Sequence, residues 1–533
     1  MSTLRPTALA PLLVLLVSAC GGGGGGGEPA TVDLTLTNAA VEQTVYEGDG
    51  GTLVIPGILL KGGPAVDEET WIRFTPDNAS VLGASVTFAY QPNETSFGWA
   101  ASVSAGLALG EYTGTIGVQA CADEDCVFVY DAAAQPYTVN VLSHTNLTTL
   151  TALPGAGAWT MLQGGPAHTG YVPVTLDPAA FLSRWRVNLS PGGGSITFQP
   201  AVTIEDGIVY LSTGSSGPMV QARSEHDGSQ VWQTSNSSSG HSAPAVANGV
   251  AFIVGNASTP AIRKIIAGTV QSEVGTFGLN NNYFPDPASP TLHGGKVYAN
   301  GGTYYGTHAF DASTLALLWA KPMGGSIIST PAVDGTAVYA AGDDGEGSGS
   351  LVALDPANGE LLWRADLFTL PDVGTYGITP VISDLGRVVV PMPKRLSVVD
   401  SSTHEVLWSA TGGFDISGLN VEARAPAVAN GVVYSTTNVP SLVARDEATG
   451  AVLWVWAPPI HTSTFIGNVV ATDSHVFVSS YNEVTGGVTH AIDLATRQAV
   501  WSYPRPGNLS ISENGILYIS SQGSHYLIAI NLH

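Results

Sequence analysis

The sequence predicts an all-β protein, an eight-bladed β-propeller preceded by a small immunoglobulin-like β-sandwich domain. Three observations support this fold class. Gly (64) and Pro (33) are abundant and charged residues make up only 11%, which is typical of a turn-rich β protein and unfavourable for long amphipathic helices. Short runs of alternating apolar and polar residues fill residues 31–143. The remainder of the chain repeats itself about every 44 residues, as propeller blades do.

Residues 1–30 are typical of a secretion and anchoring segment. Arg5 precedes an apolar stretch at residues 9–17, which is shorter than the roughly 20 residues of a membrane-spanning helix. Residues 17–20 (Val-Ser-Ala-Cys) resemble the bacterial lipobox, so we expect a signal peptide at residues 1–19 and lipidation of Cys20. Residues 20–30 would then form a lipidated, Gly-rich tether. The alternative is an ordinary signal peptide with an incidental cysteine.

Residues 31–143 contain about seven short strands separated by turn residues, which indicates an immunoglobulin-like sandwich. Cys121 and Cys126 lie close together in this segment. In an oxidising compartment such a pair predicts a disulfide. A metal site would need further ligands, and none is evident nearby. We expect the domain to be a spacer, with a ligand-binding module as the alternative.

After a linker and lead-in segment at residues 144–180, residues 181–533 contain eight repeats. The most specific feature of a repeat is an Asp at the end of its third strand, followed eight positions later by a Trp. We expect the carboxylate to cap a tight turn, with Gly359 and Gly450 allowing positive φ in two of these turns. We expect the Trp to dock between adjacent blades. The predicted turn caps are Asp311, Asp355, Asp400, Asp446 and Asp493, and the predicted docking residues are Trp185, Trp232, Trp319, Trp363, Trp408, Trp454 and Trp501.

The two ends of the propeller sequence predict how the ring closes. The eighth repeat ends at His533 without a Trp strand, whereas an apolar strand carrying Trp185 stands alone at residues 182–187. We therefore expect this early strand to complete the last blade, which would leave the ring without a free edge.

The Asp–Trp repeats, together with Trp159 and His168 in the lead-in segment, resemble the quinoprotein-like propeller repeat. One branch of that family comprises dehydrogenases that hold pyrroloquinoline quinone (PQQ) and calcium on the propeller axis. The other comprises non-catalytic lipoproteins similar to the outer-membrane assembly factor BamB. The resemblance implies a disulfide between neighbouring cysteines beside the quinone of the dehydrogenases, and this propeller contains no Cys. We therefore expect no enzyme, no cofactor, no catalytic residue and no metal site.

The remaining sequence features give little indication of a catalytic or metal site. Nucleophile-elbow, zinc-protease and phosphate-loop motifs are absent from the sequence. The acidic hairpin at residues 343–348 is either a solvated turn or a calcium site, and His168 and His241 are expected to be structural. The formal net charge of −24 disfavours nucleic acid as a partner.

The sequence thus predicts a non-catalytic binding or scaffold lipoprotein of the bacterial cell envelope, in which the propeller is a protein-interaction platform. Its partners would be envelope proteins or the outer-membrane assembly machinery. Its location would be the outer membrane, lipid-anchored, on the periplasmic or the cell-surface face. Three alternatives are a PQQ- and calcium-dependent dehydrogenase, a surface adhesion module that binds polysaccharide or protein, and a structural envelope protein with no specific ligand.

Overall fold

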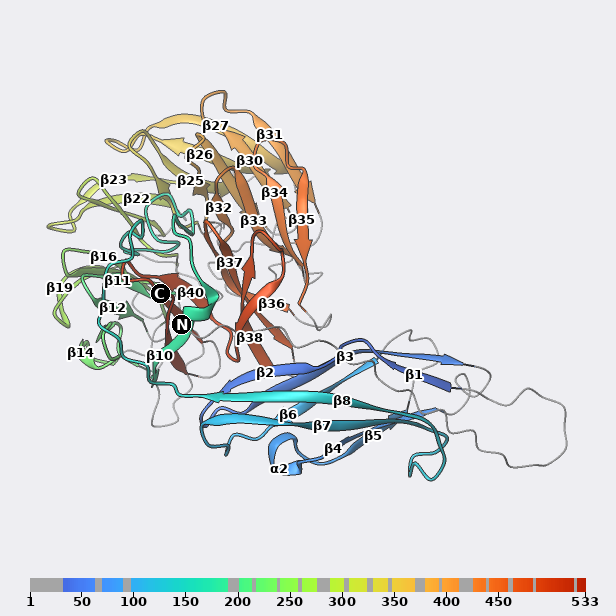
Figure 1. Cartoon of the computed structure of the whole chain (residues 1–533). Coiled ribbons are helices and arrows are strands. Elements are labelled where there is room, and N and C mark those ends of the chain that lie inside the picture. The colour runs from blue at the N-terminus through green and yellow to red at the C-terminus, as the bar shows by residue number, and fades with distance from the viewer. Residues whose placement is uncertain are drawn as a thin grey trace.

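The computed structural model describes residues 32–62, 70–89, 97–189, 201–212, 217–236, 240–256, 261–275, 288–301, 306–323, 329–343, 348–369, 379–392, 395–411, 425–437, 441–458, 464–482, 486–521 and 525–533. Strands form almost all of its regular secondary structure, with one short helix, α2 (Ala79–Leu82), and one 3₁₀ turn (Pro178–Ala180) in the described ranges. The predicted fold class is confirmed, since eight blade-like sheets follow a smaller β domain (Figure 1). No helix in the described ranges has the length and apolar character needed to cross a bilayer.

The smaller domain consists of two sheets around one apolar core. The first sheet contains β1 (Val32–Leu36), β3 (Gly51–Gly62) and β6 (Phe97–Val103). The second contains, in order, β2 (Val41–Tyr46), β8 (Val129–Leu142), β7 (Gly110–Cys121), β4 (Trp71–Pro76) and β5 (Val86–Ala89). Alternate residues of both sheets, among them Ile55, Phe74 and Val118, are buried between them, as the period-two pattern requires. Assignment of this sandwich to the immunoglobulin-like class stays a prediction.

Each blade is an antiparallel sheet that runs from an inner to an outer strand. The first three blades contain β11 (Thr203–Glu205), β12 (Ile208–Leu211), β13 (Gln221–Ser224) and β14 (Gln230–Gln233); β15 (Gly240–His241) with β16 (Ala245–Ala247), β17 (Val250–Asn256), β18 (Ala261–Ile266) and β19 (Thr269–Gly275); and β20 (Thr291–His293), β21 (Lys296–Gly301), β22 (Gly306–Asp311) and β23 (Leu317–Lys321).

The fourth to sixth blades contain β24 (Ala332–Val333), β25 (Val338–Asp343), β26 (Ser348–Leu354) and β27 (Leu361–Thr369); β28 (Val381–Ile382), β29 (Arg387–Met392), β30 (Arg395–Asp400) and β31 (Val406–Thr411); and β32 (Ala427–Ala429), β33 (Val432–Thr437), β34 (Ser441–Asp446) and β35 (Val452–Trp456). The last two contain β36 (Thr464–Thr472), β37 (His475–Asn482), β38 (Gly486–Asp493) and β39 (Ala499–Tyr503), with β9 (Tyr171–Val172) beside β36; and β40 (Asn508–Ile511), β41 (Ile516–Ser520), β42 (Tyr526–Asn531) and β10 (Leu182–Asn188).

The pairing of β10 with β42 closes the ring, which confirms the predicted role of the early strand. Their register runs antiparallel from Leu182 opposite Asn531 to Asn188 opposite Tyr526. The strand brings Trp185 into the core of the last blade, where its ring lies 5.8 Å from that of Tyr518. The eighth blade is thus built from both ends of the propeller sequence.

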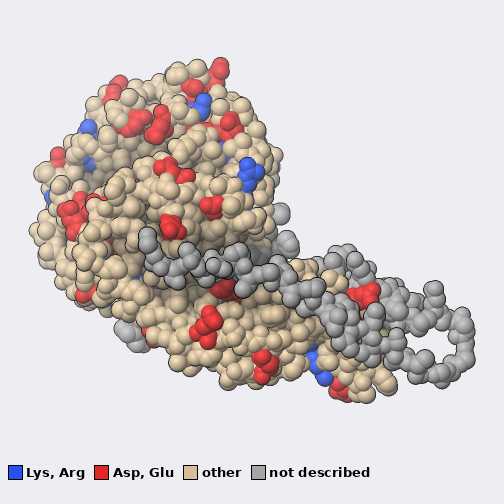
Figure 2. Space-filling model, in the orientation of Figure 1, with Lys and Arg blue, Asp and Glu red and all other residues tan. Residues whose placement is uncertain are grey.

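Several predicted features lie outside the described residues. These are the signal peptide and tether at residues 1–30, including Cys20, and residues 344–347 of the acidic hairpin. On the described surface, carboxylates are spread over both domains and basic side chains are few on the face in view (Figure 2). This distribution agrees with the net charge of −24.

Candidate functional site

The predicted Asp residues cap the turns between the third and fourth strands. A carboxylate oxygen of Asp311 accepts hydrogen bonds from the backbone N–H groups of Ser313 and Thr314, both at 2.9 Å. Asp400 does the same for Ser402 and Thr403. Bonds from the neighbouring hydroxyls and N–H groups lower the pKa of Asp311 and of Asp400 to about 2. Asp355, Asp446 and Asp493 accept backbone bonds in the equivalent turns.

Most of the predicted Trp residues dock on the same turn of the following blade. The Nε1–H groups of Trp185, Trp319 and Trp408 donate to backbone carbonyls there, at 2.8–3.2 Å. Gly359 has φ +73°, and a Cβ on it would lie 2.5 Å from Cε3 of Trp319. The glycine therefore serves the turn and also makes room for the indole. Gly228, Gly268 and Gly450 lie against Trp185, Trp232 and Trp408 in the same way.

The other predicted Trp residues use different partners. Trp363 stacks on the His404 ring, with centroids 4.7 Å apart and planes at 17°. Trp454 packs against the apolar core shared by the sixth and seventh blades. Trp501 meets the Phe181 ring edge-on at 5.6 Å. All of these contacts hold blades or the lead-in segment in place.

The lead-in segment fills one end of the propeller axis. Backbone carbonyls between Trp159 and Gly170 accept N–H bonds from the inner strands of six blades, at 2.7–2.8 Å: Ile204 to Trp159, Val246 to Thr160, Val333 to Pro166, Ile382 to Ala167, Val428 to Thr169 and Ala471 to Gly170. The N–H of Leu153 bonds to Glu513 of the eighth blade. The lead-in segment therefore links blades that lie up to 360 residues away along the chain.

Two buried side chains of this segment complete the links. Nδ1 and Nε2 of His168 lie 3.3 and 3.1 Å from the Pro380 carbonyl and the Thr291 hydroxyl, so this ring contacts the third and fifth blades. Burial lowers the pKa of His168 to about 4, so the ring is neutral at physiological pH. The amide of Gln163 donates to the carbonyls of Pro426 and Val469. His168 and Gln163 are thus structural in their geometry.

The position of the lead-in segment affects whether a quinone and calcium, as in the dehydrogenases, could bind on the propeller axis. Protein atoms of residues 159–170 occupy the end of the axis where they meet the inner strands. Within the described ranges no three His, Cys, Asp or Glu side chains gather so as to hold a metal ion. All three cysteines precede the propeller, and two of them, Cys121 and Cys126, form a disulfide in the sandwich. The described residues therefore do not fit a quinone held with calcium.

A buried carboxylate joins the sandwich to the propeller. The side chain of Asp49, in a sandwich turn, is only 3% exposed. Its carboxylate lies 3.1 Å from both His144 and Arg505, with Arg186 in contact as well. Burial opposes ionisation, but the bond to His144 and the charges of Arg505 and Arg186 together outweigh it and lower the pKa of Asp49. Beside this cluster, Tyr46 of β2 packs 4.7 Å from Tyr503 of β39. Charge and apolar contact therefore fix the junction together.

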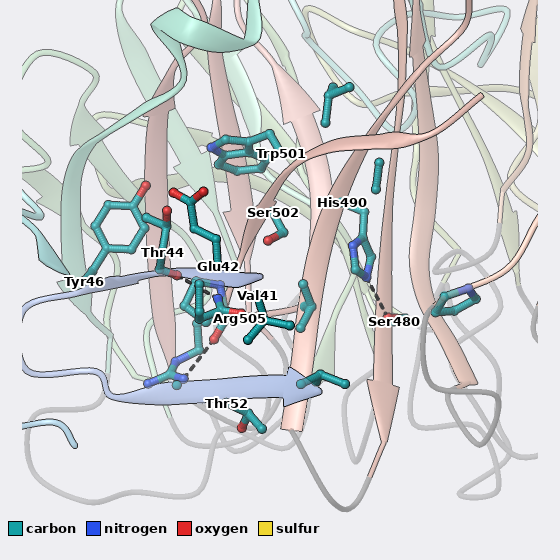
Figure 3. A pocket seen from close by; sticks show the side chains of 18 of the residues that line it. Val41, Glu42, Thr44, Tyr46, Thr52, Ser480, His490, Trp501, Ser502 and Arg505 are labelled. Atoms are coloured by element: carbon teal, nitrogen blue, oxygen red, sulfur yellow. Dashed lines mark hydrogen bonds between the residues drawn. The ribbon is translucent and has the colours of Figure 1, made fainter. Parts of the chain in front are cut away.

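A cavity of about 820 Å³ opens beside the junction. Figure 3 shows that its labelled side chains come from the sandwich on one side, among them Glu42 and Thr52, and from the seventh blade on the other, among them His490 and Trp501. Burial lowers the pKa of His490 to about 4, and its Nε2 lies 3.1 Å from the Ser480 hydroxyl. With the carboxylate of Glu42, the guanidinium of Arg505, an indole and neutral polar groups around it, the cavity has the room and mixed polarity of a small-ligand site.

The outer strands of four blades carry a repeated apolar surface. In the third to sixth blades, two consecutive exposed apolar residues precede the Trp: Leu317 and Leu318, Leu361 and Leu362, Val406 and Leu407, and Val452 and Leu453, each 38–55% exposed. A β-bulge lies at the second residue of every pair. The bulge adds one residue to the outer strand, which turns the Trp inward and leaves both preceding side chains facing out. The alternation expected of a strand therefore fails at this point.

Comparison with known proteins identifies relatives of the propeller. A family model described as outer membrane protein assembly factor BamB matches residues 168–269 and 347–529. BamB of Yersinia pestis is 26% identical over 185 residues, which are 32% of this chain and 46% of that protein. The chain thus spans about half the length of the curated BamB relatives it matches. A tetrathionate hydrolase of Acidithiobacillus ferrooxidans is 22% identical over 441 residues, which are 71% of this chain and 78% of that protein.

Solved structures agree on the fold. BamB from Moraxella catarrhalis has a TM-score of 0.51 at 15% identity, covering 66% of this chain and 99% of that one. The quinohemoprotein alcohol dehydrogenase of Comamonas testosteroni has a TM-score of 0.55 at 15% identity, covering 70% and 80%. At these identities the likeness shows a shared fold and nothing of shared chemistry.

The expectation that the protein is not an enzyme is contradicted. The relative that aligns with 71% of the chain is named as a hydrolase, and alcohol and methanol dehydrogenases share the fold. The expectation relied on missing motifs and on a propeller without cysteine. Those absences argue against particular catalytic designs only, and a propeller can build others from its loops.

Proposed function

The chain belongs to the family of the outer membrane protein assembly factor BamB, since the family model matches more than half of its residues, and on that premise we propose that it is a binding platform of the cell envelope. Its propeller would hold protein partners on the outer strands of the blades. The observation that carries this proposal is the apolar pair repeated on four consecutive outer strands.

Exposed apolar residues on an outer strand are unusual in a soluble protein unless a partner covers them. Each pair is next to a Trp docked on the following blade, and two of these Trp side chains, Trp319 and Trp408, donate an Nε1–H to a backbone carbonyl there. The surface is therefore held rigid before any partner arrives, which lowers the entropic cost of binding. A strand or apolar segment of an envelope protein fits such a surface.

The finer location is part of the same proposal. The lipobox-like residues 17–20 and the Gly-rich residues 21–27 support a lipid anchor at Cys20, and the family supports the outer membrane as its site. The partner would be an envelope protein such as a component of the outer-membrane assembly machinery.

Photo-crosslinking in intact cells of the source organism tests the platform. A photoreactive residue replaces Leu318 in one variant and Leu407 in another, and a control replaces Leu385, a 57% exposed leucine in the turn between β28 and β29. We expect protein adducts from the two outer-strand positions that the control does not give, with outer-membrane assembly proteins identified by mass spectrometry. Equal adduct patterns at all three positions would contradict the proposal.

A second candidate function comes from the hydrolase relative. It aligns with more than two thirds of both chains, so the shared part is far longer than a single blade. We propose tetrathionate as the substrate to test first. Purified protein incubated with tetrathionate should consume it faster than a heat-denatured control if this function is present, and equal rates would remove the candidate.

A further inference from the structure

An apolar tip stands at the far end of the sandwich. It comprises residues 127–130 (Val-Phe-Val-Tyr), which lead into β8 after the turn from β7. Val127 and Phe128 are each 71% exposed, more than any other large apolar side chain among the described residues. Val129 is 43% exposed and Tyr130 37%. Four consecutive apolar residues exposed to water indicate a surface that an apolar partner or environment covers.

The tip is held outward by bonds within the turn. The disulfide between Cys121 and Cys126 closes the turn just before it. The carboxylate of Asp123 accepts hydrogen bonds from the N–H groups of Val127 and Phe128, at 3.0 and 3.2 Å. The N–H of Ala122 donates to the carbonyl of Phe128 at 2.9 Å. With its backbone fixed at both ends, the tip cannot fold back onto the sandwich to bury its side chains.

The chain enters the sandwich at the same end. The N–H of Leu34 in β1 donates to the carboxylate of Asp131 at 2.7 Å, so the first described strand starts beside the tip. Eleven residues separate Cys20 from Val32 in the sequence, and seven of them are the glycines 21–27. From its Gly-rich composition alone, a chain of this length would have a root-mean-square end-to-end distance of about 20 Å and a maximum reach of about 40 Å.

We propose that the tip inserts into the interfacial layer of the lipid bilayer that holds the anchor at Cys20. The inference rests on the lipid anchor of the proposed function, and it adds a second membrane contact made by the folded domain. The tether would hold the tip at high local concentration near the bilayer, and the Phe and Tyr rings suit the boundary between headgroups and acyl chains. Asp123, Glu124 and Asp125 stand next to the tip, so zwitterionic lipids would be preferred over anionic ones.

This contact would set the orientation of the whole molecule. The 12 residues of β7 and the 14 of β8 run from the tip to the propeller junction, where Leu142 packs against the propeller core. At about 3.3 Å per residue the strands span roughly 40 Å. The propeller would therefore stand about that far from the membrane, with its outer strands accessible to partners.

Photo-crosslinking to lipid tests the tip in the full, lipidated chain. A photoreactive residue replaces Phe128, and the control replaces Leu109, which is 55% exposed at the opposite end of the same sandwich. Each variant is reconstituted into vesicles of phosphatidylethanolamine and phosphatidylcholine, and lipid adducts are measured by mass spectrometry. We expect at least tenfold more lipid adduct at position 128 than at position 109, and less at position 128 when anionic lipid is added.

The outcomes separate the tip from the anchor. If the protein binds vesicles but gives equal amounts of lipid adduct at positions 109 and 128, the tip proposal is overturned and the lipid anchor is not. A protein adduct at position 128 in place of a lipid adduct has the same meaning. If intact-mass measurement of the purified chain finds no acyl chains on Cys20, the lipid anchor is overturned, and the tip proposal with it. Since both substituted positions are exposed, neither variant should unfold the domain, and circular dichroism checks this.

Discussion

Replacement of Gly359 by Ala should destabilise the propeller through two separate effects. The residue has φ +73°, where a Cβ adds strain of about 1–2 kcal/mol. The new Cβ would also lie 2.5 Å from Cε3 and 2.7 Å from Cδ2 of Trp319. Trp319 is 7% exposed, so it can move only by disturbing packed neighbours, at a cost of about 1–3 kcal/mol. We expect a total loss of about 2–5 kcal/mol.

Gly207→Ala is the matched control for the backbone effect. Gly207 has φ +72°, yet a Cβ there would meet no atom within 4 Å. It should therefore lose only the strain of about 1–2 kcal/mol. Urea unfolding followed by tryptophan fluorescence gives the midpoint and slope for both variants. The difference between them, about 1–3 kcal/mol, measures the collision with the indole.

A third variant decides whether Trp319 is the cause. In a Trp319→Ala background the space beside Gly359 is empty, so Gly359→Ala should then lose no more stability than Gly207→Ala. If Gly359→Ala and Gly207→Ala are equally destabilised in the wild-type background, the docking argument is wrong. The same holds if the extra loss persists without the indole.

Three further predictions follow from the buried groups. Asp49→Asn should cost about 3 kcal/mol at pH 7. Because the folded pKa of Asp49 is lowered, its contribution is fully present above the unfolded pKa of about 4 and is lost as pH falls through the folded pKa. The gap between the urea midpoints of variant and wild type should therefore narrow as pH falls below about 4, and a gap that stays constant would refute this. His168 has a folded pKa of about 4, below the unfolded value of about 6.5, so the wild-type free energy of unfolding should decline as pH falls from 6.5 to 4. His168→Asn should flatten that decline, and at pH 7 it should lower the free energy of unfolding by about 1–3 kcal/mol. Replacement of both Cys121 and Cys126 by Ser should lower sandwich stability by about 2 kcal/mol, measured by urea unfolding, and no loss would show that Asp123 alone holds the turn.

The propeller could be predicted from the sequence because its signals are local and repeated. The Asp and the Trp of a repeat are eight positions apart, and turn capping and strand alternation act within that distance. The bulge before each Trp was missed, although two adjacent apolar residues such as Leu317 and Leu318 interrupt the alternation and carry its signal. A run that breaks period two beside a buried aromatic is therefore informative in itself.

The junction and the axis could not be predicted in the same way. Asp49 reads as an ordinary turn residue between glycines, and its partner Arg505 lies 456 positions away. Gln163 and His168 contact blades more than 120 positions distant. These contacts depend on the ring being closed, so no local pattern announces them. The expectation that the protein is not an enzyme was wrong for a different reason: the absence of a motif excludes only the catalytic chemistry that uses that motif.

The shared eighth blade has a consequence for how the protein is made. β10 and β42 are partners, yet β42 leaves the ribosome roughly 20–70 s after β10 at 5–20 residues per second. Throughout that time β10 has an unpaired edge, which is prone to wrong pairing. An exported chain of this design would depend on holding chaperones until its last strand arrives. A chain that lacks β42 at its C-terminal end would then form an unclosed propeller that is degraded by proteases, and not a stable propeller that is slightly shorter.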